Sequence, residues 1–389
     1  MHVLMISLDS RLATQPDSNS VRRHIEYADH AGKLTIVAYT KPGSGGPRQH
    51  SENLTVIPTN SISRFTFVAD ALRLASRVIA DEKPDLITTQ DPFAAGLVGW
   101  IARNQAQVPV LVQNHCYFID NEAWLAENPL RNYPFNALGK FVSSRADMYR
   151  TVNEHERDTF LSRGGSAERV FTYPLGTASD AFINPPLESD LDAAREKLGI
   201  EPHHKVIIWA GFPVAFKRVP LLLDVFRRVV ELEPDARLLL VGDMSGSKDD
   251  IPAIMDRLGI REQVIAPGFV PHAELPAYYG LADVYLMTSS YEGIPRVLME
   301  ASAAALPLVA FDRVGVREVV NDGENGYLLP EGDCDGMAQR VVELLHDEEK
   351  AQQFGQNARR ISVERFSATK NAENVIATWE QAIALGLKS

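Results

Sequence analysis

Two glutamates, Glu292 and Glu300, lie in the stretch SSYEGIPRVLMEASAAALPLVA (289–310), whose small and aliphatic residues predict a buried helix followed by a buried strand. Pro295 suits the first turn of that helix because its missing N–H is not needed there. Glu292 and Gly293 then stand at the helix entrance, where free N–H groups bind anions such as phosphate. This position favours a ligand-binding role for the loop before the helix.

Glu300 raises a different question because it falls inside the predicted helix. A carboxylate is rarely buried without a partner. Glu300 could be a surface residue, or it could pair with Arg296 one turn earlier. It could instead accept two neighbouring hydroxyls of a ligand, such as those of a ribose. The residues alone leave these three interpretations open.

The elements that position these residues follow from the pattern of the whole chain, in which apolar strands alternate with amphipathic helices. Such alternation is typical of parallel sheets covered by helices on both faces. In the N-terminal half we expect strands at 3–8, 33–39, 85–90, 108–115, 147–152 and 169–174, with helices at 20–31, at 64–82 and from 92. In the C-terminal half we expect strands at 205–211, 236–243, 263–268, 283–288 and 306–311, with helices at 219–232, 249–258, 273–280, 295–304, 334–346, 349–364 and 369–385.

The alternation breaks at 176–188, where turn residues predict a linker. We therefore expect an α/β chain of two doubly wound Rossmann-like domains, at 1–180 and 181–365, with a helical segment at 366–389 that packs back toward the N-terminal domain. The length of 389 residues agrees, because one core rarely exceeds about 250–300 residues. Ligands of such sheets bind beyond the carboxyl ends of the strands, so we expect the domains to face an interdomain cleft.

Composition restricts the partners and the compartment. The net charge is -12, and residues 1–180 are nearly balanced, with 18 basic and 19 acidic side chains, so the acidic excess lies in the remainder. This charge argues against a nucleic-acid partner. The two cysteines are far apart in sequence, as in proteins of a reducing cytosol. No signal peptide or spanning helix is expected. Peripheral membrane contact through 64–80 stays open, although its spacing fits core packing better.

Several segments extend the pattern beyond the two glutamates. EGIPRVLME resembles the Glu-x7-Glu signature of the retaining nucleotide-sugar glycosyltransferases of family 4 (glycosyl transferases group 1), which have the GT-B fold. SRADMYRTVNEHERDTFLSRG, LLLVGD, PGFVPHAELPAYYGLADVYLMTSSYEG and GVREVVNDGENGYLLPEGD are similar to that family in order and spacing. The resemblance covers most of residues 85–340.

The resemblance implies a role for each matching residue. Glu300 would bind the ribose hydroxyls and Glu292 the transferred sugar, while the amides of Gly293 and Ile294 would bind the diphosphate or the sugar. Lys217 would neutralise the departing diphosphate, which a fixed cation can do without a metal. The implied donor-binding set is Gly211, Lys217, Arg218, Phe269, Val270, Glu292, Gly293, Ile294, Pro295 and Glu300.

Two further residues carry alternatives. His115 matches a family histidine that would face the sugar from the N-terminal domain, and with Lys217 and Glu292 it completes the catalytic set. It could also be a hydrogen-bonded loop histidine. Arg218 could contact the diphosphate, but a solvated residue at the start of a helix is the preferred interpretation. The turn at 267–270 would lie against the nucleobase.

The sequence also departs from the family pattern. Phe212 stands where the family commonly has an arginine, which puts the affinity for diphosphate in question. The stretch DSRLATQPDSNSVRRH after the first strand contains no glycine, which leaves acceptor contacts unassigned. Ala305 replaces the glycine that usually ends the helix carrying Glu300.

We therefore expect a retaining glycosyltransferase that moves a hexosyl or N-acetylhexosaminyl group from a UDP- or GDP-type donor. The acceptor would be a sugar, a lipid-linked sugar or a small molecule, in polysaccharide or glycoconjugate biosynthesis. No cofactor or metal is expected, because no Asp-x-Asp metal motif stands in a suitable loop and SKDD (247–250) is typical of a helix cap. An epimerase or phosphorolytic enzyme of the same fold and a non-catalytic sugar-nucleotide-binding protein stay open. A nicotinamide-dependent dehydrogenase is disfavoured because no Gly-x-Gly-x-x-Gly follows the first strand.

Overall fold

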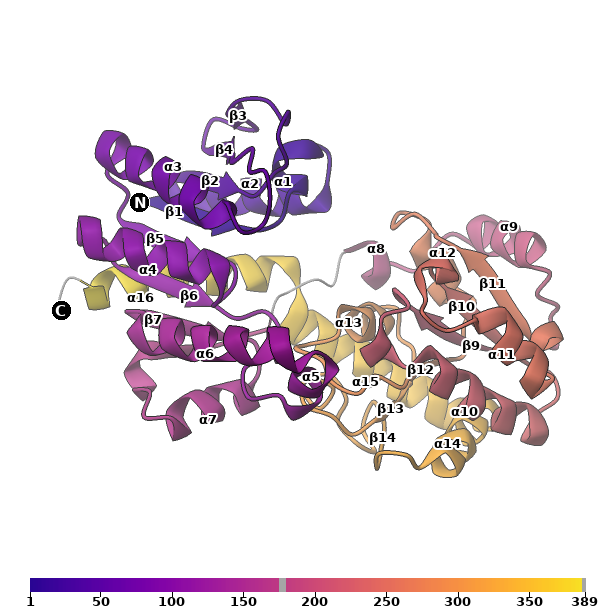
Figure 1. Cartoon of the computed structure of the whole chain (residues 1–389). Helices are drawn as coiled ribbons and strands as arrows, with labels where there is room; N and C mark the ends of the chain where they lie inside the picture. Colours follow the sequence, from indigo (N-terminus) through magenta and orange to yellow (C-terminus); the bar gives the residue numbers. More distant parts are fainter. Residues whose placement is uncertain (175–179, 387–389) are drawn as a thin grey trace. The chain divides into compact units, whose positions relative to one another are not determined.

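The computed structural model describes residues 1–174 and 180–386 and divides the chain into two compact units. Unit 1 comprises Met1–Leu175 and Asn371–Ser389, and unit 2 comprises Gly176–Lys370. The elements of each unit are labelled in Figure 1. The boundaries expected from the sequence lie after 180 and after 365, and the two units divide after Leu175 and after Lys370.

Unit 1 is built on an eight-stranded sheet in the order β3-β4-β2-β1-β5-β6-β7-β8. All neighbours are parallel except the β3–β4 pair. Its inner strands are apolar and buried on both faces, as parallel sheets require. The strands are β1 (His2–Ser7), β2 (Lys33–Ala38), β3 (Arg48–Gln49), β4 (Leu54–Pro58), β5 (Leu86–Thr89), β6 (Val110–Gln113), β7 (Met148–Thr151) and β8 (Val170–Thr172).

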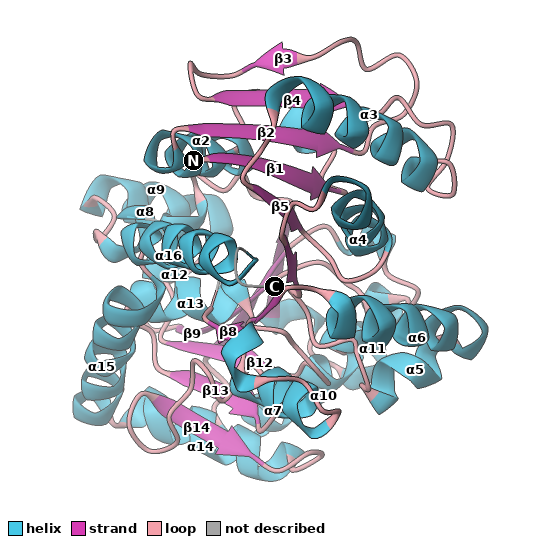
Figure 2. Ribbon diagram, turned by 90° about the vertical axis from the view of Figure 1, so that its left-hand side faces the viewer, coloured by secondary structure: helices cyan, strands magenta, loops and turns pink. Residues whose placement is uncertain are grey.

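Helices cover both faces of this sheet. One face packs against α3, α4, α6 and α7 and the other against α1, α2 and α16; Figure 2 shows α3 and α4 opposite α2 and α16 across the strands. The helices of unit 1 are α1 (Arg11–Thr14), α2 (Asn19–Ala31), α3 (Phe67–Glu82), α4 (Ala94–Ala106), α5 (Glu122–Glu127), α6 (Pro129–Arg145), α7 (Glu154–Ser162) and most of α16 (Ala368–Gly386).

Unit 2 has a six-stranded parallel sheet in the order β11-β10-β9-β12-β13-β14. The strands are β9 (Lys205–Ala210), β10 (Ala236–Val241), β11 (Val264–Gly268), β12 (Val284–Met287), β13 (Leu308–Phe311) and β14 (Gly326–Leu329). The helices are α8 (Asp180–Ile183), α9 (Glu188–Leu198), α10 (Val219–Leu232), α11 (Ile251–Leu258), α12 (Leu275–Gly280), α13 (Arg296–Ala303), α14 (Cys334–His346) and α15 (Glu348–Phe366). One face packs on α10, α11 and α14, the other on α12, α13 and α15.

The strand order in both sheets reverses at one point, because the chain first builds outward on one side and then on the other. In unit 2 the reversal lies between β9 and β12, and in unit 1 it lies between β1 and β5. Ligands of doubly wound sheets bind at such a switch point, beyond the carboxyl ends of the strands. The loops after β9 and β12 are those that carry Lys217 and Glu292.

The expected α/β fold is confirmed, but the sequence pattern missed several elements. β4, β14, α6 and α9 were not expected. The linker prediction is wrong where it covers 180–183, which is helical, and residues 175–179 lie outside the described part of the chain. Phe182 explains that helix, since its buried ring packs edge-on against Tyr279, 5.3 Å between centroids.

The last helix, α16, joins the core of unit 1 from Asn371 onward. Ala372, Val375, Trp379 and Ala382 are buried there, and Trp379 packs edge-on against Tyr27 of α2 at 6.2 Å. The Asn371 amide donates a hydrogen bond to the Tyr27 hydroxyl. The helices described over 1–174 and 180–386 include none that is long and apolar enough to cross a membrane.

Candidate functional site

The switch point of unit 2 brings two of the predicted residues into direct contact. Lys217, at the end of a short 3₁₀ turn after β9, places its Nζ 2.5 Å from Oε1 of Glu292, in the loop after β12. Their side chains are only 12% and 11% exposed. An ion pair at this depth is far less screened than a surface pair. The site is therefore a cation held in place by a carboxylate.

Backbone contacts fix the two loops against each other. The amide of Ser290 donates to the carbonyl of Phe216 at 2.8 Å, and the hydroxyl of Thr288 donates to the carbonyl of Lys217 at 3.2 Å. The rings of Phe216 and Tyr291 stack with centroids 4.9 Å apart. These contacts hold Lys217 and Glu292 without help from a ligand, which is the preorganisation that charge stabilisation needs.

Arg218 is not the solvated residue that the sequence suggested. Its Nε donates to the carbonyl of Thr288 at 2.8 Å, its Nη2 donates to that of Ser289 at 3.3 Å, and the guanidinium also pairs with Glu331. Its backbone is left-handed, with φ 51°, and burial lowers the pKa of the guanidinium. Arg218 therefore braces the two loops, and its predicted contact with the donor remains a prediction.

Glu300 is buried, so the interpretation as a surface residue is wrong. The hydroxyl of Tyr279 donates to Oε2 at 3.4 Å, and Nε2 of His272 lies 3.5 Å from Oε1. Arg296, one turn earlier, is 4.0 Å away and half exposed, which makes it a weak partner. Burial and the nearby Tyr285 and Glu300 raise the pKa of Tyr279, which keeps its hydroxyl a donor.

Both glutamates act on one buried tyrosine of β12. Burial is the main cause that raises the pKa of Tyr285, and the charges of Glu300 and Glu292 add to it. Its hydroxyl donates to the carbonyl of Ala210, the last residue of β9, at 3.4 Å. Glu292 and Glu300 thus share the environment at the carboxyl end of β9, directly before Gly211.

The helix entrance is shaped by close backbone packing. Gly315 has φ +73°, and a Cβ there would lie 2.1 Å from the carbonyl oxygen of Gly293 and 2.6 Å from that of Glu292. Only glycine fits at position 315, so the backbone of the loop after β13 packs directly against the turn at Glu292 and Gly293. Pro295 is the N-cap of α13, and Gly293 is buried whereas Ile294 is half-buried.

Two loops at the same sheet edge carry exposed aromatic side chains. Phe212, after Gly211 and β9, is 70% exposed, and Phe269, after β11, is 71% exposed. Val270 is buried beside it. Gly242, after β10, packs its backbone on Gly211, since a Cβ there would lie 2.0 Å from the carbonyl oxygen of Gly211. Exposed aromatic rings at a ligand edge offer surfaces for stacking.

His115 belongs to unit 1, in the loop after β6, and both of its ring nitrogens are occupied. Nη1 of Arg150 donates to Nδ1 at 3.0 Å, so the proton sits on Nε2, which donates to Oε1 of Gln90 at 2.8 Å. Burial and the charges of Arg150 and Arg23 hold the pKa of His115 well below its ordinary value. His115 is therefore neutral and fixed in one tautomer. It has the hydrogen bonds that the alternative interpretation, a hydrogen-bonded loop histidine, expects.

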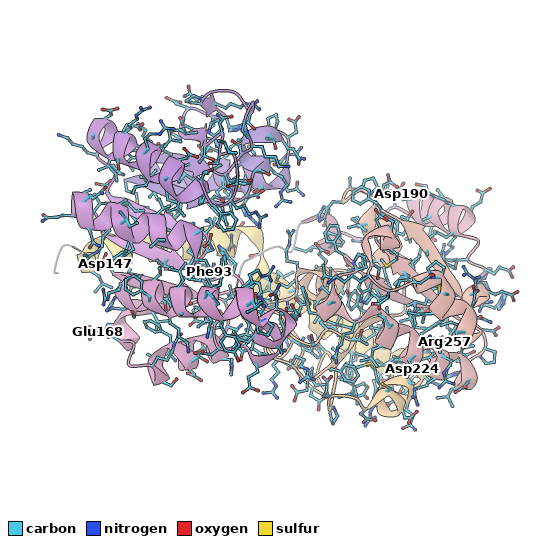
Figure 3. The ribbon with its side chains drawn as sticks, in the orientation of Figure 1. Phe93, Asp147, Glu168, Asp190, Asp224 and Arg257 are labelled. Atoms are coloured by element: carbon cyan, nitrogen blue, oxygen red, sulfur yellow. The ribbon has the colours of Figure 1, made fainter. Side chains whose placement is uncertain are left out.

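An aromatic group holds the loop that follows His115. Phe93, at the start of α4 and labelled in Figure 3, packs against Trp124 at 6.1 Å and against Phe135 at 5.5 Å. Phe118 of the His115 loop lies 5.1 Å from Trp124. Asp91 caps the N-terminus of α4, since its Oδ1 accepts hydrogen bonds from the amides of Phe93 and Ala95.

Sequence reasoning missed the side chains that surround the predicted ones. Tyr279, His272, Gln90 and Arg150 were not singled out, although Tyr279 and His272 lie inside the segment PGFVPHAELPAYYGLADVYLMTSSYEG that carries the resemblance. Arg150 had a usable signal, because a charged residue in the middle of a short apolar strand needs a reason. The predicted cap is confirmed: Asp250 accepts from the amide of Ala253 at 3.1 Å.

Among the described residues, one group has the geometry to hold a metal ion, namely Glu201, His203 and His204. Glu201 and His203 are exposed, and the group precedes β9, at the amino ends of the strands. Lys217 and Glu292 lie at the opposite, carboxyl ends. This group is therefore separate from the candidate functional site.

Comparison with known proteins gives the family. A sequence model described as "Glycosyl transferases group 1" matches residues 190–361, and one described as "Glycosyl transferase 4-like domain" matches residues 22–176, so that together they span most of the chain.

Individual relatives agree with the family models. The chain is 27% identical over 309 residues to "Putative glycosyltransferase EpsD" of Bacillus subtilis, covering 78% of each chain. It is 30% identical over 262 residues to "D-inositol 3-phosphate glycosyltransferase" of Mycobacterium sp. (strain KMS), covering 65% of this chain and 57% of that one. Among solved structures, Anabaena Alr3699/HepE in complex with UDP superposes with a TM-score of 0.77 at 21% identity, covering 97% of this chain and 99% of that one. The chain belongs to the glycosyl transferases group 1 and is a glycosyltransferase with the GT-B fold.

Proposed function

We propose that this glycosyltransferase moves a hexosyl or N-acetylhexosaminyl group from a UDP-type sugar donor to an acceptor hydroxyl, with retention at the anomeric carbon. The observation that carries the proposal is the preorganised pair of Lys217 and Glu292 at the switch point of unit 2, with Glu300 inside the helix that follows Glu292. The presence of UDP in the Anabaena structure supports the choice of base.

Lys217 supplies the charge that the leaving group needs. As the bond from the anomeric carbon to the phosphate breaks, negative charge grows on the diphosphate, and Lys217 stabilises it in a site largely protected from water. Glu292 holds the ammonium in place in the free enzyme. When the diphosphate of the donor pairs with the Lys217 ammonium, Glu292 is free to accept a hydrogen bond from a hydroxyl of the sugar.

Glu300 anchors the nucleoside. Its carboxylate accepts from Tyr279 through one oxygen, and the other oxygen faces His272 at 3.5 Å. A carboxylate has about four acceptor positions, so capacity is left for two ribose hydroxyls. Arg218 braces the loops beneath the donor, and the aromatic rings of Phe212 and Phe269 flank the same edge.

Retention through a double displacement would need a carboxylate nucleophile beside the anomeric carbon. In unit 2 Glu300 is already held by Tyr279, and Glu292, once the diphosphate holds Lys217, is assigned to a hydroxyl of the sugar. We therefore favour attack of the acceptor on the same face, with the departing phosphate taking its proton. Rate enhancement then depends on positioning and charge stabilisation.

The test is a turnover assay with a panel of UDP-sugars and GDP-sugars and a mixture of sugar and polyol acceptors, followed by NMR of the product anomer. We expect transfer from a UDP-sugar with retained configuration, and at least a hundredfold lower turnover for Lys217→Ala. Lys248→Ala, an exposed lysine of the same unit, should turn over normally. An inverted anomer would contradict retention, and an epimerised donor without transfer would favour the epimerase alternative.

A further inference from the structure

The carboxyl edge of the unit 1 sheet holds a group of arginine and histidine side chains that the donor chemistry does not use. Arg150 of β7 is fully buried. Arg23 and His24 of α2 lie close to it, since the charge of Arg23 lowers the pKa of both Arg150 and His115. Burial and the same arginine lower the pKa of His24 to about 4. Two arginines and two histidines thus share one polar layer.

This layer is poor in acidic partners. Arg150 donates to Oε1 of Gln113 at 3.3 Å, to His115 at 3.0 Å and to the carbonyl of Tyr173 at 2.9 Å, all of them neutral groups. Its guanidinium lies over the ring of Tyr173, 4.0 Å from the centroid. Among residues 1–174 and 180–386 no carboxylate forms an ion pair with it. The charge of Glu156 affects the pKa of Arg150 less than burial, Tyr173 and Tyr27 do.

Two donors in the layer are unsatisfied. The Nε atoms of Arg23 and of Arg150 are buried and make no hydrogen bond within the described part of the chain. Asp9, whose charge raises the pKa of His24, already accepts hydrogen bonds from Arg11 at 2.8 Å and from the hydroxyl of Ser20 at 2.8 Å. A buried guanidinium without a counter-ion is costly, and buried charges are normally paired. An anion from outside the chain would supply the missing partner.

We propose that the cluster of Arg23, His24, His115 and Arg150 binds an anionic group of the acceptor, either a phosphate or a carboxylate. The proposal rests on the proposed function in one respect: if the donor diphosphate occupies Lys217 in unit 2, the anion in unit 1 belongs to the acceptor. Arg23 is half-buried and makes the direct contact, and charge-assisted bonds to a guanidinium are strong and specific for such anions.

Arg150 acts as a positioning residue because it is fully buried. Its bond to Nδ1 of His115 fixes the Nε2–H tautomer, in which Nε2 donates to Oε1 of Gln90, so the imidazole is held in one orientation at the sheet edge. Binding of the acceptor's anionic group would then position the attacking hydroxyl of the acceptor. Binding energy gained away from the reacting atoms lowers the barrier of the transfer in this way.

Neighbouring arginines of α2 provide a matched test. Arg23 is half-buried and Arg22 is exposed, so Arg23→Gln and Arg22→Gln remove the same charge from adjacent positions. Calorimetric titration with inorganic phosphate and with acetate at low ionic strength should show saturable binding of one of them. We expect Arg23→Gln to weaken it at least fivefold and Arg22→Gln to change it less than twofold. The phosphate and acetate arms identify which anion the site prefers.

Three results would overturn the proposal. The first is that neither anion binds saturably. The second is that Arg22→Gln and Arg23→Gln weaken anion binding equally. The third is that Lys217→Ala abolishes anion binding while Arg23→Gln retains it. For Arg150, imidazole ¹⁵N shifts should show loss of the Nε2–H preference of His115 in Arg150→Met and its recovery in Arg150→Lys. An unchanged tautomer in Arg150→Met would end that role. A parallel titration with UDP tests the proposed function separately, since Arg23→Gln should leave UDP affinity unchanged.

Discussion

Replacing Glu292 by glutamine should lower the stability of the protein and yet tighten the binding of UDP. In the free enzyme Glu292 lies 2.5 Å from the Lys217 ammonium. The substitution keeps the shape of the side chain and removes only its charge. Lys217 is then an uncompensated cation, which costs free energy in the absence of ligand and attracts a diphosphate more strongly when one is present.

The exposure of the pair sets the size of the effect. Breaking a fully buried pair costs about 3–5 kcal/mol, and an exposed pair contributes less than about 1 kcal/mol. With side chains 12% and 11% exposed, we expect a loss of about 2–3 kcal/mol in the free energy of unfolding of unit 2. At about 2–4 °C per kcal/mol, the melting temperature should fall by roughly 4–12 °C.

Calorimetric titration with UDP gives the second half of the prediction. Glu292→Gln should bind UDP about 3- to 10-fold more tightly, about 1 kcal/mol, whereas Lys217→Ala should bind it at least tenfold more weakly. Lys248→Ala is the control for the loss of a lysine charge. If Glu292→Gln weakens UDP binding as much as Lys217→Ala does, the glutamate does not compete with the diphosphate for the ammonium, and the reasoning fails.

Three further predictions concern single residues. Ala305, at the C-terminal end of α13, has φ +60° in a turn that is closed by a hydrogen bond from the Leu306 amide to the carbonyl of Ala301. Because glycine adopts this conformation without strain, Ala305→Gly should raise the free energy of unfolding by about 1 kcal/mol in urea. No gain in stability would refute the strain. Burial raises the pKa of Asp91 from 3.8 to about 6, so the folded state binds the proton more tightly and loses about 3 kcal/mol in total as pH rises from about 3 to about 7. Asp91→Asn, which keeps the cap, should remove that loss, and an unchanged pH profile would count against it. Arg218→Ala should reduce turnover at least tenfold through displacement of the loops, seen as lower melting temperature, and wild-type stability would contradict a bracing role.

Strongly periodic segments could be predicted from the sequence, and segments that depend on tertiary contacts could not. The helices at 219–232 and 334–346 begin and end where their apolar period places them, with a proline in the first turn of one and Asp333 capping the other. By contrast, α6 carries Pro134 in its interior and shows almost no amphipathic period, so it gave no helix signal. The strand β14 begins at Gly326 and contains four residues, too few to show alternation.

The candidate site divides in the same way. Resemblance to a family pointed to Lys217, Glu292 and Glu300, and the contact between the first two joins the loops after β9 and β12 across 75 residues of sequence. Spacing could not show which partner Glu300 has, since Tyr279 lies on another helix. Arg150 escaped notice because a polar residue in a strand usually faces solvent, and only the packing of α2 and α16 over this face buries it.

The most direct test of the central claim is a crystal structure of the full chain grown with saturating UDP. We predict a diphosphate oxygen within hydrogen-bonding distance of Lys217 Nζ, with the ribose hydroxyls on the carboxylate of Glu300 and the uracil beside Phe269 and Val270. UDP bound elsewhere, or an ammonium and carboxylate that remain free of nucleotide at saturation, would contradict the account.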